Sequence, residues 1–284
     1  MPRVELCSEA GAGNNEDLVA VHENGNVTDI FVLDGATSVA ECNYVDNQQG
    51  DVTWFVRYFA AELGKIFAPD SSQESMVLRA AAATCSEWRD RTEGSPAPPY
   101  AWPIAALTWI RAIPGAEATV IHVYSLGDCK TLIREPDGTV RDLDPWTNPQ
   151  EAILQREIAA MVAEGVTESA QRLARLMPLL RKRREEQNSA LAPAVVCMSP
   201  GGPFSARKAV LQVKAGAVLL CMTDGFYRLV DPYDLYSPGQ LIDACSLRGL
   251  APLLLELRNV EGSSSTKGLT VKAADDASAV MWTA

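Results

Sequence analysis

The first third of the chain opens with two short runs of β-forming residues. LVAVH at 18–22 and TDIFVL at 28–33 are separated by an Asn-Gly-Asn triplet. An Asn-Gly step between two such runs is a strong hairpin signal. The pattern therefore predicts a β-hairpin whose second strand ends at Asp34.

Helical spacing of apolar positions alternates with further strand-like runs along the rest of the chain. Strands are expected at 104–113, 118–126, 130–134, 194–198, 209–213, 217–222 and 277–282. Helices are expected at 51–66, 73–89, 149–190 (two or three), 238–244 and 250–260. The run at 217–222 is continuously apolar, which is typical of a strand buried on both faces. Groups of strands separated by helices suit an α+β layered sandwich better than a strict βαβ alternation.

The sequence contains no internal repeat and no proline-rich linker. We therefore expect a single domain over residues 1–284, with a helical insertion or flap at about 149–190. Within that insertion, the RKRREE run at 181–186 combines basic residues with two glutamates. Such a mixture favours a solvated helix end over an anion-binding patch.

Composition excludes several classes of partner. The chain of 284 residues is 47% hydrophobic and has a formal net charge of -11. An acidic chain is repelled by nucleic acid, so we expect no nucleic-acid partner. The longest apolar runs are too short to span a bilayer, so we expect no membrane association.

The seven cysteines show no Cys-x-x-Cys spacing, and the first residues have no apolar signal-peptide core. Both features favour reduced thiols and a cytoplasmic location.

Several acids share one context, the end of an apolar strand-like run. They are Glu16, Asp17, Asp34, Asp128, Asp224, Asp275 and Asp276. Carboxylates at strand ends can converge on one cleft from distant parts of the chain, and gathered carboxylates repel one another unless a cation lies between them. Oxygen ligands select Mg²⁺ or Mn²⁺ over zinc. Any single Asp-Gly is more often a turn, as we expect for Asp137-Gly138, so only the whole set of acids indicates a metal site.

These acids lie in stretches that resemble the type-2C (PPM family) metal-dependent protein serine/threonine phosphatases, in a bacterial-like form. The stretches are NNEDLVAV, DIFVLDGATS, VYSLGDCKTLI, VLLCMTDGFYRLV and ADDASAVMW, in family order from about Gly11 to Trp282. The resemblance implies a four-layer α-β-β-α sandwich of two antiparallel sheets flanked by helices. It also implies two Mg²⁺ or Mn²⁺ ions in a cleft at one end of the sheets, with a weaker third ion in some members.

The resemblance assigns a role to each of the matching acids. Asp34 would bridge both ions, the backbone carbonyl of Gly35 would bind one of them, and Asp224 and Asp275 would complete the other. Asp275 matches the acid of the family's usual Asp-Asn pair, and Asp276 takes the asparagine position.

Glu16 and Asp17 match the acidic pair that holds metal-bound water, and Asp128 matches a residue of the third-metal site. Asp34 and Asp17 are therefore the expected catalytic residues.

The chain departs from the family in its phosphate-binding groups. Where members often carry an arginine shortly before the acidic pair, this chain has Ala12 or a neighbour. Ala36 cannot act as the general acid that a histidine provides in some members. Arg57, Lys130 and Arg228 are the candidates for binding substrate phosphate, and Arg228 stands near where an acidic third-metal ligand is expected.

The resemblance implies that the protein hydrolyses phosphoserine and phosphothreonine of proteins by direct attack of a metal-bridging hydroxide. Its partners would be a phosphoprotein substrate and a cognate serine/threonine kinase. The alternatives are a non-catalytic phosphatase-fold binding or regulatory module, motivated by the missing arginine, and a small-molecule phosphatase.

Overall fold

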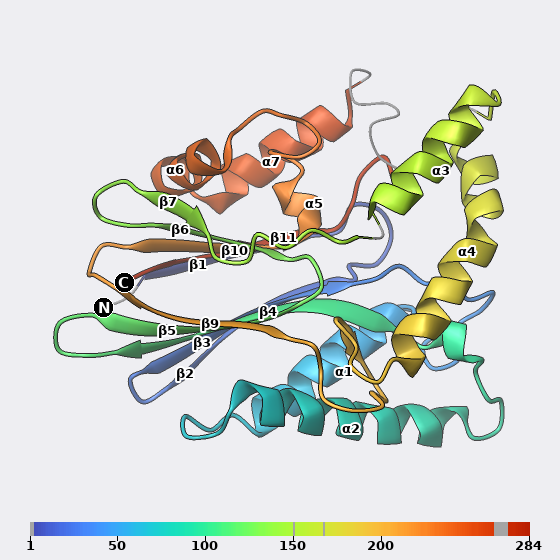
Figure 1. Ribbon diagram of the computed structural model, residues 1–284, viewed down its shortest axis with the longest axis horizontal. Helices are drawn as coiled ribbons and strands as arrows, with labels where there is room; N and C mark the ends of the chain where they lie inside the picture. The colour runs from blue at the N-terminus through green and yellow to red at the C-terminus, as the bar shows by residue number, and fades with distance from the viewer. Residues whose placement is uncertain (1–2, 150, 167, 264–271) are drawn as a thin grey trace.

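The computed structural model describes residues 3–149, 151–166, 168–263 and 272–284. Two antiparallel sheets lie face to face, and helices cover both outer faces (Figure 1). The expected α+β class and the four-layer sandwich are both confirmed.

Sheet A carries the strands that precede and follow the C-terminal acids. Its order is β1 (Arg3–Glu9), β11 (Ala277–Thr283), β10 (Val218–Met222), β6 (Lys130–Arg134) and β7 (Val140–Asp142). Sheet B has the order β2 (Asp17–Asn24), β3 (Val27–Gly35), β4 (Ile104–Pro114), β5 (Thr119–Leu126) and β9 (Arg207–Val213), and β8 (Val196–Cys197) pairs with β4. Every neighbouring pair in both sheets is antiparallel.

Helices form the outer layers. Sheet B is covered by α1 (Asp51–Lys65) and α2 (Gln73–Thr92), and sheet A by α5 (Asp224–Tyr227), α6 (Pro238–Arg248) and α7 (Leu250–Glu261) (Figure 1). At one end of the sandwich stand α3 (Glu151–Ala163) and α4 (Ser169–Ser189), and α4 contacts the short 3-10 helix η1 (Pro99–Ala101). Two helices thus form the segment expected to be an insertion or flap, within which residues 150 and 167 lie outside the described residues. Its role as a flap stays a prediction.

The strand β10 is buried on both faces, as its unbroken apolar sequence predicts. Leu220 and Met222 pack toward the α6–α7 layer, whereas Leu219 and Cys221 pack between the two sheets. The inter-sheet core draws on both sheets, for example through Ile110. The two sheets are therefore held together by apolar packing along their length, and this fixes the strand ends relative to each other.

The predicted hairpin is confirmed, with a two-residue turn at Gly25 and Asn26. The pattern did not predict the strands β1 and β7, the 3-10 helix η1 or the short helix α5. Arg3–Glu9 carries charged residues along an edge of the sheet and pairs with β11 over its whole length, so its strand state depends on a distant partner. No helix in the described part of the chain is both long and apolar enough to cross a bilayer.

We predict that the inter-sheet core governs stability. Replacing Ile110, whose side chain is fully buried, in an Ile110→Ala variant should lower the free energy of unfolding by about 2–5 kcal/mol because it leaves a cavity. Val210→Ala, at a side chain that is 64% exposed, should change it by less than about 0.5 kcal/mol. Urea denaturation measures both, and equal losses would contradict this account of the core.

Candidate metal centre

The two acids at the open end of the hairpin face each other across β2 and β3. Asp17 is the register partner of Asp34. Paired residues of antiparallel strands project to the same face, so the two carboxylates point to the same side of sheet B. Gly35 follows directly, and its N–H donates to the Glu16 carbonyl over 3.1 Å. A Cβ at Gly35 would lie 2.5 Å from that oxygen, so only glycine fits this approach.

The C-terminal acids come from adjacent strands of sheet A. Asp224 follows β10, and Asp275 precedes β11, which runs antiparallel beside it. Thr223 connects this end to the hairpin: its Oγ1 donates to Asp17 Oδ2 over 2.9 Å, and its N–H donates to the Ser278 carbonyl over 3.0 Å. Acids from both sheets therefore meet at one end of the sandwich.

Asp34 lies at the centre of this gathering. Burial raises the pKa of Asp34 well above its usual range, and the charges of its acidic neighbours raise it further. Those neighbours, in order of effect, are Asp224, Asp17, Asp128 and Asp275. Acids that are far apart in the sequence are thus brought together, as the sequence predicts.

The surrounding carboxyls share the same effect. Burial, with the charges of Asp276 and Asp224, raises the pKa of Asp17 to about 8. Desolvation also raises the pKa of Asp224 to about 7, with Asp128 and Asp275 adding to it, although part of Asp224 remains exposed to solvent. Burial raises the pKa of Glu16 as well. The cluster therefore holds more negative charge than its surroundings stabilise, which is the condition that a divalent cation relieves.

Asp276 fixes the loop that carries Glu16. Its carboxylate accepts the N–H of Gly11 at 2.9 Å and the N–H of Glu16 at 2.6 Å. The backbone of Asp276 passes so close to Gly225 that a Cβ there would lie 1.9 Å from the Asp276 carbonyl oxygen. The residue in the family's asparagine position thus positions the backbone around the acids.

Asp275 has a different environment from Asp34. Its Oδ2 accepts a hydrogen bond from Arg228 over 2.7 Å, and its Oδ1 accepts one from Lys272 over 2.7 Å. Both oxygens of this carboxylate are therefore already paired with cations, which the sequence did not predict.

Asp128, the expected third-metal residue, lies close enough to Asp34 to act on its charge. One of its oxygens accepts from the side chain of Asn148 over 3.1 Å. The adjacent Cys129 is buried, and burial together with the charge of Asp34 raises the pKa of its thiol well above the usual value. A thiol whose pKa is raised in this way stays protonated near neutral pH, which disfavours a role as nucleophile.

The three candidate phosphate-binding residues occupy different positions. Arg228 binds Asp275, and Lys130 donates to the Trp146 carbonyl over 2.9 Å. Arg57 lies on the exposed side of α1 and contacts Gln49.

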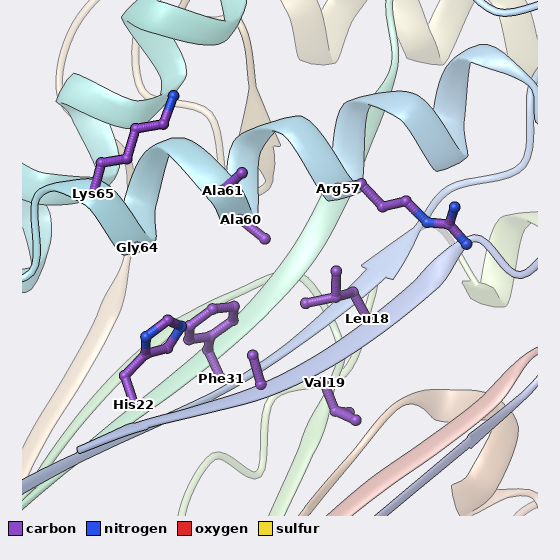
Figure 2. A pocket seen from close by; sticks show the side chains of 10 residues that line it. Leu18, Val19, His22, Phe31, Arg57, Ala60, Ala61, Gly64 and Lys65 are labelled. Atoms are coloured by element: carbon purple, nitrogen blue, oxygen red, sulfur yellow. The ribbon is translucent and has the colours of Figure 1, made fainter.

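Figure 2 shows Arg57 at the rim of a largely apolar groove between α1 and the hairpin strands. The stacked rings of His22 and Phe31 lie in this groove. Arg57 thus borders an apolar surface, and its role in binding phosphate stays a prediction.

The sequence pattern did not indicate that Arg184 contacts the backbone beside the acids. The expectation of a solvated end for its helix is right for Lys182 and Glu186 but wrong for Arg184, which is 6% exposed. Its guanidinium donates to the carbonyls of Ala36 and Thr37 over 3.3 and 3.1 Å. In the sequence, only the position of Arg184 around the helix, within the RKRREE run, distinguishes this buried residue from exposed ones such as Lys182 and Glu186.

The charges around Asp34 favour a hard divalent cation, whereas those around Asp275 do not. Near Asp34 the donors are oxygens of carboxyl groups whose pKa values are raised. Gly35, which has no Cβ, lets the backbone come close to Glu16 at this point. At Asp275 side-chain cations already supply the positive charge. Among the described residues, no group of three or more His, Cys, Asp or Glu side chains is arranged ready to hold a metal ion.

Solved structures match the fold over nearly the whole chain. A serine/threonine phosphatase from S. agalactiae aligns with a TM-score of 0.57 and 15% identity, covering 100% of this chain and 99% of that chain. PstP/Ppp from Mycobacterium tuberculosis aligns with a TM-score of 0.54 and 15% identity, covering 99% of this chain and 98% of that chain. The likeness extends to a PPM phosphatase of Mycobacterium smegmatis, with a TM-score of 0.54 and 14% identity, covering 99% of this chain and 97% of that chain. The chain has the fold of the PPM serine/threonine phosphatases.

At these identities the likeness establishes the PPM fold, and any activity has to be inferred from the residues of the site. RsbX, solved with magnesium, shares the PPM fold with a TM-score of 0.53 and 10% identity over 100% of this chain and 99% of that chain. No protein-family model and no curated protein sequence matches the chain.

We predict that Gly225 is required for the geometry of the site. Gly225→Ala should lower the free energy of unfolding by about 2 kcal/mol or more because its Cβ collides with the Asp276 backbone. Gly94→Ala is the matched control, since nothing lies within 4 Å of a Cβ there. Chemical denaturation of both variants checks this. If Gly225→Ala leaves the free energy of unfolding unchanged, the close approach of Gly225 to the Asp276 backbone is wrong.

We also predict that the metal-free protein loses stability as the pH rises from 5.5 to 8. A carboxyl whose pKa is raised in the folded state binds its proton more tightly there than in the unfolded chain, so its stabilising contribution is present at low pH and is lost as the pH approaches the folded pKa. For Asp17 that pKa is about 8.

Urea denaturation in a chelator measures this decline, and Asp17→Asn should flatten it. Asp137→Asn, at the exposed turn aspartate, should leave the slope unchanged because the Thr139 backbone N–H lowers the pKa of Asp137, which places its titration below this pH interval. Stability that rises over this interval would contradict the prediction.

Proposed function

We propose that the protein is a metal-dependent phosphohydrolase that removes phosphate from phosphoserine and phosphothreonine residues of proteins. The observation that carries this proposal is the convergence of Asp17, Asp34 and Asp224 from separate strands, each with a raised pKa. A cluster of this kind is costly unless it serves to bind cations, because each ionised carboxyl disfavours the ionisation of the next.

The proposed ligands are those expected from the sequence. They are Asp34, Gly35 through its carbonyl, Asp224, Glu16 and Asp17, with Asp128 at a third site, and Asp275, which would first have to part from Arg228 and Lys272. Bound Mg²⁺ or Mn²⁺ would neutralise charge on the phosphoryl group and acidify a water for attack near neutral pH. A PstP catalytic domain of the same fold was solved with 2 manganese ions, which supports this choice of metal.

The chain's own residues would position the reacting groups. Asp34 holds the centre of the cluster from a strand end, where its backbone is rigidly paired with β2 and β4. Asp17, whose carboxylate accepts the Thr223 hydroxyl, lies opposite Asp34 in the strand register and can orient a water beside it. Direct attack by water needs no cysteine intermediate, in keeping with the raised pKa of Cys129.

A phosphoprotein is the proposed substrate, and a serine/threonine kinase that phosphorylates it would be the functional counterpart. We propose a cytoplasmic location. Arg184, which supports the backbone beside Asp34 from α4, connects the helical segment to the site. This contact supports a role for α3 and α4 in forming one wall of the substrate cleft.

A second candidate is a phosphatase-fold module that binds a phosphoprotein without hydrolysing it. The ion pairs of Asp275 with Arg228 and Lys272 favour it, because they neutralise one of the acids expected to bind metal.

We predict that the protein hydrolyses p-nitrophenyl phosphate and a phosphothreonine peptide only when Mn²⁺ is present. Asp34→Asn should lower kcat by about a hundredfold or more, since a central charge for binding the cations is removed. Asp137→Asn, at a second Asp-Gly step on an exposed turn, should keep the activity of the parent protein. Steady-state kinetics with a panel of phosphopeptides and sugar phosphates distinguishes protein from small-molecule substrates. Tight binding of a phosphopeptide with no turnover on any member would support the binding module instead.

A further inference from the structure

The half of the acid site at Asp275 already contains positive charge. Arg228 lies at the end of the short helix that Asp224 begins, one turn further along the chain. One of its terminal nitrogens donates to Asp275, and the other donates to Glu261 over 3.1 Å. The guanidinium therefore bridges two carboxylates, and the Arg228 side chain is only 10% exposed.

A second arginine makes this arrangement part of the fold. Glu261, whose side chain is 2% exposed, also accepts from Arg258 over 2.6 Å. Arg258 in turn donates to the backbone carbonyl of Asp275 over 2.8 Å and to that of Glu9 over 2.9 Å. Moving Arg228 away from Asp275 would disturb a buried carboxylate, so Arg228 is fixed by packing and pairing on both sides.

Lys272 brings a further cation toward the acids. Its ammonium donates to the other oxygen of Asp275 and also interacts electrostatically with Glu16 and Asp34. A divalent ion at Asp275 would therefore lie beside two cations that repel it, with both carboxylate oxygens already occupied. The strongest charge effects on Asp34, in contrast, all come from acids.

We propose that this site binds a single divalent cation at Asp34, and that Arg228 and Lys272 take the place of the second ion at Asp275. This inference rests on the proposed function and changes one part of it: Asp275 serves to hold the two side-chain cations at the rim of the site. The fixed positive charges would then act beside the bound ion, and both could attract the negative oxygens of a phosphoryl group.

The experiment is a calorimetric titration of Mn²⁺ into the full chain after removal of metal with a chelator. We expect one ion per wild-type chain and none in Asp34→Asn. Asp275→Asn should still bind one ion with an affinity within about threefold of wild type, because its carboxylate is not a ligand. Circular dichroism of each variant confirms that it is folded.

The matched variant removes the internal cations. Arg228→Gln combined with Lys272→Gln frees Asp275 and should raise the stoichiometry to two ions per chain. If loss of Arg228 prevents folding, Lys272→Gln alone should tighten Mn²⁺ binding at least threefold, since it removes a positive charge beside Asp34.

Three results would overturn the inference: two ions on the wild-type chain, a loss of Mn²⁺ affinity of tenfold or more in Asp275→Asn, or a folded double variant that still binds one ion. Its failure is distinguishable from that of the proposed function. Two bound ions together with Mn²⁺-dependent hydrolysis would support the proposed function and contradict this inference. One bound ion without hydrolysis would support this inference and contradict the proposed function.

Discussion

Negative charge gathered at one end of two stacked sheets is the constraint on which the rest of the site depends. Asp17 and Asp34 are held opposite each other by strand register, and Asp224 reaches them from the other sheet. None of these positions can relax without breaking a strand pair or the apolar packing between the sheets. The fold therefore maintains a repulsion that the protein alone does not relieve around Asp34, and a bound cation is the simplest way to relieve it.

The negative charge of the acids at this end of the molecule is compensated in two different ways. Around Asp34, raised pKa values mark carboxyls that lack a positive partner of comparable strength. Asp275, in contrast, has positive partners from the chain itself, which are Arg228 and Lys272. A family resemblance places both acids in one ligand set, but their surroundings differ, and the chemistry of each follows from its neighbours.

Much of this could be predicted from the sequence because the informative features are local. The Asn-Gly step fixed the position of the hairpin, and the unbroken apolar run at 217–222 indicated a strand buried on both faces. The acids were found because each follows or precedes such a strand. What could not be predicted depends on distant contacts: β1 becomes a strand only by pairing with β11, and Arg184 shows its role only where α4 meets the backbone of Ala36 and Thr37.

The central claim is that the acids around Asp34 form a cation site, and a manganese anomalous map from a crystal soaked in Mn²⁺ tests it most directly. The account predicts an anomalous peak within coordination distance of an Asp34 carboxylate oxygen, about 2.0–2.4 Å away. A well-soaked crystal with no peak among Asp17, Asp34 and Asp224 would contradict it.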